Sequence, residues 1–237
     1  MRALINILDL RPLIKQDELK ATTVIILSPL LVTLHRYFGS MEVGREWLGL
    51  NSGLAPSAFM FISAFILFGI VPLVIITKMF HGHPRDFGIQ VGNWRGGLGI
   101  IPVLFPLIAI TLLYPASKTQ EITSFYPFAR ESANSVGGFM ALQALRGLFF
   151  YSAWEFLFRG FMLFGLRRHV GDWMAICIQT VPQCLWHIGM PTGEILSSIV
   201  GGILFGVIAI RTQSILWPML LHFLIGVGLD ALIVLNI

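Results

Sequence analysis

Glu155 and Arg159 are the residues best suited to chemistry, because they stand four apart inside an otherwise apolar run from Val136 to Leu166. The run contains no proline, so it predicts one long helix, in which residues four apart share a face. In a bilayer each charge costs at least ~2.5–3.5 kcal/mol at the membrane centre, and charges kept there usually face a bundle interior and serve a function. We therefore expect a buried carboxylate–guanidinium pair, with Ser152 one turn earlier on the same face.

Two histidines in later apolar runs are candidates to join this pair. His187 shares a helical stripe with Gln179 and Gln183, and His222 lies in the last apolar run. Glu155, His187 and His222 can converge on one water, which the carboxylate would deprotonate while an imidazole polarises it or donates a proton. The same three side chains also match a known ligand set for catalytic zinc, and the spacing leaves both interpretations open.

The predicted depths of these three residues differ. Counted from the inner ends of their helices, Glu155 lies about 16 Å deep, His222 about 12 Å and His187 about 21 Å. A single site requires a smaller spread, which a tilt, a later start of the fifth helix or a break at Pro182 would give.

The composition predicts an integral membrane protein. The 237 residues are 56% hydrophobic and only 12% charged, with a mean hydropathy of +0.80, whereas soluble domains carry about 25% charged residues. Lys and Arg outnumber Asp and Glu by 16 to 12 but form no basic cluster, so we expect a lipid bilayer and no nucleic acid as partner.

The apolar runs predict an all-α polytopic transmembrane bundle of about seven helices, with eight if the second is broken at Gly69 or Pro72. Residues 1–20 are predicted to be a cytoplasmic interfacial segment, and 21–237 a single transmembrane domain with its core at about 136–235. The expected spans are Ala21–Leu34, Pro56–Ile76, Gly96–Tyr114, Val136–Leu166, Trp173–Ile188, Ile195–Ile210 and Ile215–Leu235.

The basic residues predict a cytoplasmic N-terminus. With that orientation ten of them fall on the inner side and four on the outer side, as the positive-inside rule requires. The inner set is Arg2, Arg11, Lys15, Lys20, Lys78, Arg85, Arg95, Arg167, Arg168 and Arg211, and the outer set is Arg36, Arg45, Lys118 and Arg130.

Several other residues in the apolar runs are predicted to have structural roles. Arg146 and Asp230 both lie toward the outer leaflet and can form a structural pair. Gly201, Gly202 and Gly206 form a small-residue face that favours close helix packing. Cys177 and Cys184 are seven apart on one helix, roughly 10 Å, which is too far for a disulfide.

The order of these motifs resembles the CAAX protease and bacteriocin-processing family, also called the Abi family, which includes the CAAX prenyl endopeptidases. The resemblance covers about Ala144–Gly226 and rests on three stretches: Trp154-Glu-Phe-Leu-Phe-Arg159-Gly160, His187 at the end of a later helix, and Arg211-Thr-Gln-Ser-Ile-Leu-Trp217-Pro218 leading into His222. It implies an intramembrane protease, and by family analogy a prokaryotic inner membrane.

The chain departs from the family motifs at three positions. Glu155 matches the second glutamate of EExxxR and Arg159 its arginine, but Trp154 stands where the first glutamate is expected. Gln183 replaces the phenylalanine of FxxxH, and Gly226 stands four residues after His222, where the family has asparagine or a similar polar residue. The resemblance assigns water activation to the first glutamate, so here Glu155 would have to act as the base.

These observations predict an intramembrane endopeptidase that cleaves a membrane-associated peptide or protein. Glu155, oriented by Arg159, would activate water, His187 would position or deprotonate that water, and His222 would stabilise the tetrahedral intermediate. The family is often labelled metalloprotease although its best-understood members are thought to need no metal, so zinc stays an open cofactor.

Two alternatives come from other functional classes. The first is a non-catalytic membrane protein of the same fold, a binding partner or immunity-type factor in which Glu155 and Arg159 are a structural staple. The second is a small transporter that uses Arg146, Glu155 and Asp230 as a relay, but these residues share no helical stripe and no repeat pair is visible.

Overall fold

The computed structural model describes residues 18–236. Within that range the chain is all-α, without β-strands. The interfacial segment expected at 1–20 lies outside the described residues apart from residues 18–20, as do Arg2, Arg11 and Lys15.

The described chain contains seven long helices, close to the positions predicted from the sequence. The second is one continuous helix, so the alternative with a break at Gly69 or Pro72 is not seen. The seven are α2 (Leu19–Phe38), Ala55–Met79 with α4 (Ala55–Ala64) and α5 (Val71–Val74), Trp94–Ala116 with α6 (Trp94–Ile108) and α7 (Tyr114–Ala116), residues 136–170, α13 (Asp172–Trp186), α14 (Thr192–Thr212) and α15 (Leu216–Val234).

The helix of residues 136–170 is the longest and changes its winding along its length. It comprises α10 (Val136–Leu145), α11 (Ser152–Glu155) and α12 (Gly165–Val170), joined by two π-helical segments at Arg146–Tyr151 and Phe156–Phe164. π-Helical turns in long helices are frequent at functional sites. Here they flank α11, which carries Glu155.

Local signals explain where this helix begins and ends. The hydroxyl of Ser135 accepts a hydrogen bond from the backbone N–H of Gly138 at 3.1 Å, which caps the helix N-terminus. At the other end Gly171 has a φ of 82°, a value that glycine tolerates best, and the chain turns there into α13.

The chain is an integral membrane protein. Five helices in the described range are long and apolar enough to cross a bilayer: Leu19–Phe38, Ala55–Met79, Trp94–Ala116, Thr192–Thr212 and Leu216–Val234. Large apolar side chains such as Ile26, Ile66, Leu107 and Val200 are exposed along their outer surfaces, as a lipid environment requires and a soluble monomer rarely shows.

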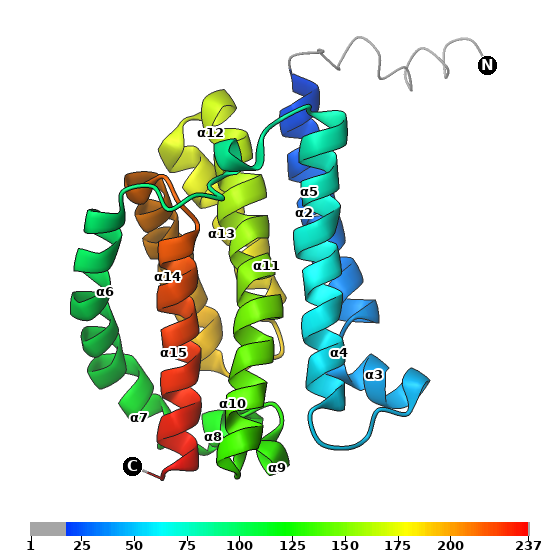
Figure 1. Ribbon diagram of the computed structural model, residues 1–237, viewed down its shortest axis with the longest axis vertical. Coiled ribbons are helices and arrows are strands. Elements are labelled where there is room, and N and C mark those ends of the chain that lie inside the picture. The colour runs from blue at the N-terminus through cyan, green and yellow to red at the C-terminus, as the bar shows by residue number, and fades with distance from the viewer. Residues whose placement is uncertain (1–17, 237) are drawn as a thin grey trace.

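Figure 1 shows the helix of residues 136–170 in the middle of the bundle. The helices α2 and Ala55–Met79 lie on one side of it, and α6, α14 and α15 on the other. Its fully buried side chains include Trp154, Leu157, Phe158 and Phe161, which belong to the main hydrophobic core. The central helix is therefore enclosed by protein, and its charges face neighbouring helices.

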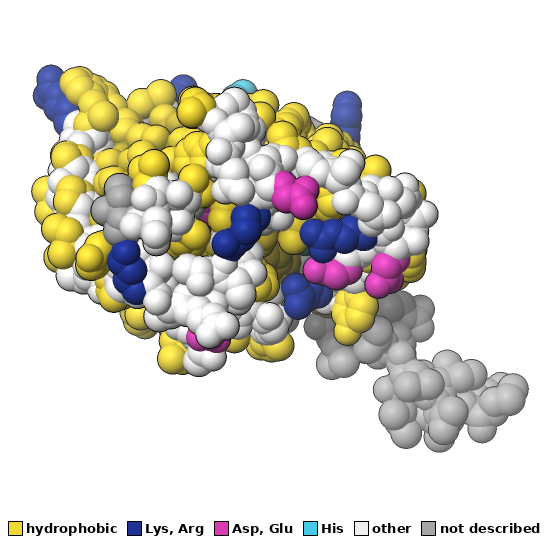
Figure 2. Space-filling model, turned by 90° about the horizontal axis from the view of Figure 1, so that it is seen from below, with side chains coloured by type: hydrophobic (Ala, Val, Ile, Leu, Met, Phe, Trp, Pro, Cys, Tyr) yellow, Lys and Arg dark blue, Asp and Glu magenta, His cyan; other side chains and the backbone are white. Residues whose placement is uncertain are grey.

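Three short helices complete the lower end of the molecule in Figure 1: α3 (Met41–Leu48), α8 (Gln120–Phe125) and α9 (Arg130–Ala133). The carboxylate of Glu121 in α8 accepts a 2.7 Å hydrogen bond from the backbone N–H of Thr192 at the start of α14. Seen from this end (Figure 2), charged and polar surface fills much of the face, while hydrophobic side chains dominate one side of its margin. α8 is thus bonded to the start of α14, next to the α13–α14 turn.

This arrangement removes the predicted difference in depth between Glu155 and His187. The central helix extends to Val170, beyond the expected end at Leu166, and α13 starts at Asp172 without a break at Pro182. Counted from the turn at Gly171, Glu155 and His187 are both about 24 Å along their helices. The two residues can therefore lie at the same level.

The packing of α13 against α14 confirms close approach at Gly202 and Gly206. A Cβ atom at Gly202 would lie 2.7 Å from the Thr180 side chain, and one at Gly206 would lie 3.1 Å from Ile176. Gly201 has open space at the same point, so it is not part of this contact. The expected polar stripe also joins these helices, because Gln179 and Gln183 donate to the carbonyls of Gly202 and Ser198.

Candidate active site

Glu155 and Arg159 form the expected ion pair at the centre of the bundle. The Arg159 Nε lies 3.2 Å from Glu155 Oε2, and both side chains have no solvent exposure. The guanidinium also lies 5.2 Å from the ring centre of Phe205 and donates to the Gly201 carbonyl at 3.4 Å. A buried pair of this kind compensates two charges that would each be costly alone.

His222 from α15 contacts the same carboxylate. Its Nδ1 lies 2.7 Å from Glu155 Oε1, and because an ionised carboxylate can only accept, Nδ1 carries the hydrogen in this bond. The ring centre of His222 lies 4.4 Å from that of Tyr151 and 5.3 Å from that of Phe205. Arg159, Glu155 and His222 thus form one continuous chain of charge-assisted contacts.

His187 also packs against Trp154, and its hydrogen-bond partner is not Glu155. The Trp154 ring centre is 5.6 Å from that of His187 and 6.4 Å from that of His222. The Nδ1 of His187 donates to the Gln183 carbonyl at 2.8 Å. This bond fixes the ring and leaves Nε2 as the nitrogen that can accept a proton.

Glu194 is a second carboxylate near this histidine, and sequence reasoning missed it. Its Oε1 lies 4.0 Å from His187 Nε2 and accepts a 2.6 Å hydrogen bond from the Tyr126 hydroxyl. Glu194 stands one residue before the predicted start of the sixth span, where an acid is typical of a solvated helix end. Only the turn between α13 and α14 brings it to His187.

Part of the chain is similar to a known protein family. Residues 137–227 match the family model described as type II CAAX prenyl endopeptidase Rce1-like. The chain carries an Rce1-like domain. Searches of curated proteins and of solved structures found no match to this chain.

The Rce1-like domain contains all four predicted site residues, Glu155, Arg159, His187 and His222, and also Glu194. Tyr126, which bonds to Glu194, precedes the domain along the chain. Tyr126 therefore contacts Glu194 from outside the Rce1-like domain, so motifs within that domain could not have identified it.

Tyr151 occupies the space beside Gly226 in the Rce1-like domain. A Cβ atom at Gly226 would lie 2.0 Å from the Tyr151 hydroxyl oxygen and 3.2 Å from Arg146 Nη2. The Tyr151 hydroxyl of the central helix therefore occupies the space that a polar side chain at position 226 would fill. Glycine is needed there because any larger residue would overlap this hydroxyl.

Arg146 and Asp230 form the structural pair that the sequence suggested. Arg146 Nη2 lies 2.7 Å from Asp230 Oδ2, and Gln143 bonds to both residues at 2.7 Å. The partners of Arg146 are thus Asp230 and Gln143, not the Glu155 carboxylate, so the relay required by a transporter finds no support.

The residues do not fit a metal centre. No group of three His, Cys, Asp or Glu side chains among residues 18–236 could hold a metal ion. Of the three proposed zinc ligands, Glu155 and His222 contact each other, whereas His187 contacts the Gln183 carbonyl and lies near Glu194. We therefore derive no step through zinc.

Two cavities lie outside this cluster of side chains. An apolar groove of about 470 Å³ runs between Ala55–Met79, the central helix and the start of α15, and its lining includes Ser152, Ala153 and Phe156. Ser152 donates to the Leu148 carbonyl and faces this groove, so it is not a partner of Glu155.

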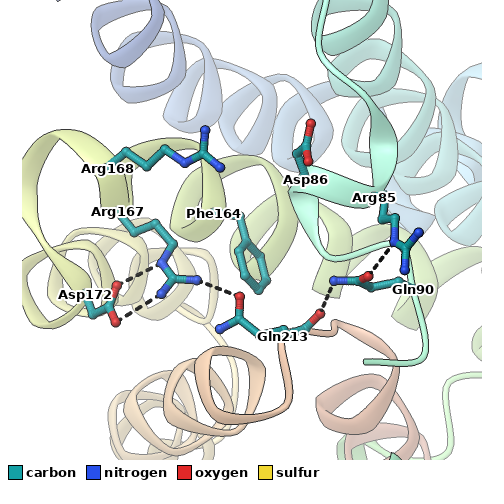
Figure 3. A pocket seen from close by; sticks show the side chains of 8 residues that line it. All are labelled: Arg85, Asp86, Gln90, Phe164, Arg167, Arg168, Asp172 and Gln213. Atoms are coloured by element: carbon teal, nitrogen blue, oxygen red, sulfur yellow. Dashed lines mark hydrogen bonds and ion pairs between the residues drawn. The ribbon is translucent and has the colours of Figure 1, made fainter. Parts of the chain in front are cut away.

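The second cavity, about 570 Å³, is polar and lies at the end of the bundle near α12. Figure 3 shows two of its basic side chains already engaged: Arg167 bonds to Asp172 and Gln213, and Arg85 bonds to Gln90. Its residues stand at the opposite end of the bundle from α8 (Figure 1) and include no histidine. We therefore do not assign the reaction to this cavity.

Proposed function

We propose that this protein is an intramembrane endopeptidase that cleaves a membrane-associated peptide or protein. The observation that carries the proposal is the 2.7 Å contact between His222 Nδ1 and Glu155 Oε1, with Arg159 behind the carboxylate. The Rce1-like domain belongs to a family of proteases, which supports the same reaction.

In the proposed reaction Glu155 acts through His222. Both carboxylate oxygens of Glu155 contact a neighbouring cation or imidazole and the side chain is fully buried, so it is poorly placed to take a proton from water. It instead balances the charge of a His222 protonated on both nitrogens, whose Nε2–H donates to the oxyanion of the tetrahedral intermediate. Such a donor is worth about 10²–10³ in rate.

His187 supplies the base in this proposal. Its Nδ1–H is held by the Gln183 carbonyl, so Nε2 can accept the proton of the attacking water. That proton then passes to the leaving nitrogen as the C–N bond breaks. The products are a carboxylate and an amine.

The apolar groove is the proposed site for the hydrophobic part of the substrate. It is lined by Ser152, Ala153 and Phe156, which are next to Glu155 along the central helix. A lipid chain, such as the prenyl group in the family description, would bury apolar surface there at about 25 cal/mol per Å².

We also propose that the N-terminus is cytoplasmic and that the protein resides in a prokaryotic inner membrane. The basic residues of the described inner ends, among them Arg167, Arg168 and Arg211, support this orientation.

The test is cleavage of an internally quenched farnesylated CAAX-type peptide by purified protein in lipid vesicles. We expect Glu155→Gln and His222→Ala to lower kcat by ~10²–10³-fold, and His187→Ala by ~10²–10⁴-fold. Asp172→Asn, an exposed acid at the Gly171 turn, is the matched control and should keep wild-type activity. Undiminished cleavage by any of the three variants would remove that residue from the mechanism.

A non-catalytic function is the second candidate, and Trp154 favours it. This fully buried ring stands where the family pattern has its first glutamate. A structural staple predicts that the charge reversal Glu155→Arg with Arg159→Glu keeps the protein's activity in the cell. An enzyme of the proposed type loses that activity, because His222 would then face a cation.

A further inference from the structure

We propose that Glu194 is a catalytic carboxylate, and that it shares the attacking water with His187. This inference rests on the proposed endopeptidase function and adds a carboxylate that holds the attacking water beside His187. It begins from one distance, the 4.0 Å between Glu194 Oε1 and His187 Nε2.

The distance fits a bridging water better than a direct bond. Hydrogen bonds to nitrogen are usually 2.7–3.2 Å long, so 4.0 Å is too far for direct contact. One water can contact two polar atoms at this separation, with a hydrogen bond of ordinary length to each. The water would donate to Glu194 and to the unprotonated Nε2 of His187.

Glu194 is partly buried but not sealed. Its side chain is 24% exposed, so water can reach it, yet its Oε2 atom is buried without a hydrogen-bond partner in the described structure. A buried carboxylate oxygen without a partner is costly. A water or a substrate N–H at this point would satisfy it.

Tyr126 holds the carboxylate in place. Its hydroxyl donates to Glu194 Oε1 at 2.6 Å. Burial and then the charge of Glu194 raise the pKa of Tyr126 well above its ordinary value, so it remains a hydroxyl donor. The carboxylate is therefore oriented by a residue of the loop after α8, and α8 itself is fixed to α14 through Glu121 and Thr192.

The position of Trp154 explains why a carboxylate from another helix is needed. Its ring lies at 5.6 Å from His187, on the central helix, at the position where the family pattern places its first glutamate. Glu194 reaches the same imidazole from α14. A carboxylate beside His187 is thus retained although its helix of origin differs.

The step balances without any further reactant. The water oxygen forms a bond to the scissile carbonyl carbon while one of its protons moves to Nε2 of His187, and Glu194 accepts a hydrogen bond from the other hydrogen. The carbonyl oxygen becomes an oxyanion facing His222. When the C–N bond breaks, His187 passes its proton to the leaving nitrogen, and the second hydrogen stays on the new carboxyl group until that group ionises.

The experiment compares Glu194→Gln with Glu131→Gln in the full-length protein, with the farnesylated peptide as probe. Glu131 is an exposed acid of α9 and serves as the matched control. We expect Glu194→Gln to lower kcat by ~10²-fold or more, with KM within about twofold and an unchanged melting curve. Tyr126→Phe should lower kcat less and also leave KM unchanged, as a positioning residue would.

The outcomes separate this inference from the proposed function. If His222→Ala abolishes cleavage and Glu194→Gln stays within about twofold of wild type, Glu194 is not catalytic and the endopeptidase function stands. If the wild-type protein does not cleave the probe, or His222→Ala and His187→Ala leave cleavage unchanged, the proposed function and the role of Glu194 are both overturned.

Discussion

Arg159 and Glu155 compensate each other's charge within one helix, where both side chains are fully buried. The guanidinium lies 3.2 Å from Oε2 and 3.3 Å from Oε1 of the carboxylate, so it approaches both oxygens, which a lysine ammonium would do less well. Removing one partner leaves the other buried and uncompensated, and that loss exceeds the net contribution of the intact pair.

We expect Arg159→Met to lower the free energy of unfolding by ~3–5 kcal/mol, because Glu155 then stays buried beside His222 alone. The double variant Glu155→Gln with Arg159→Met should lose less than the single variant. Urea unfolding in detergent micelles measures both. A double variant that is less stable than Arg159→Met would contradict this account of the pair.

Residue spacing alone predicted part of the site. The interval of four between Glu155 and Arg159 placed them on one face, and the ion pair is confirmed. The stripe of Gln179, Gln183 and His187 was also correct, but two of its members tie α13 to α14. Glu194 had no spacing signal, because an acid in the first turn of an apolar helix is also typical of a solvated helix end.

At the scale of elements, the pairing of α13 with α14 brings His187 and Glu194 together. The two helices approach closely because Gly202 and Gly206 present no side chain to Thr180 and Ile176. The expected spans agreed with the observed helices because proline, glycine and polar residues bound the apolar runs. The cover formed by α8 and α9 was not predicted, since short helices in a polar linker carry no strong periodicity.

We expect Gly202→Val to separate α13 from α14 and to lower both stability and cleavage, because its Cβ would already lie 2.7 Å from Thr180. Overpacking of this kind costs ~1–3 kcal/mol. Gly201→Val is the control on the same turn, where no atom lies within 4 Å. Melting temperature and kcat should fall together for the first variant and stay near wild type for the second.

At the scale of the whole molecule, the two ends of the bundle differ in character. The end near α12 carries Arg167, Arg168 and a polar cavity, and the other end carries α3, α8 and α9. From the positive-inside rule we propose that the first end faces the cytoplasm.

Cysteine labelling tests this orientation. In a protein with Cys177 and Cys184 replaced by Ala, we expect Glu131→Cys to react with a membrane-impermeant maleimide in intact cells. Arg168→Cys should react only after the membrane is opened. The reverse pattern would place the N-terminus outside and the Glu194 side of the bundle in the cytoplasm.

The ion pairs of the central helix also have a consequence for biosynthesis. Glu155 and Arg159 neutralise one another within a single helix, so they can leave the translocon as one unit. The partner of Arg146, Asp230, is 84 residues later in the chain and is synthesised after it. Its charge therefore stays uncompensated until the last helix is synthesised, and a nascent chain stalled before α15 would hold an unmatched cation in the lipid.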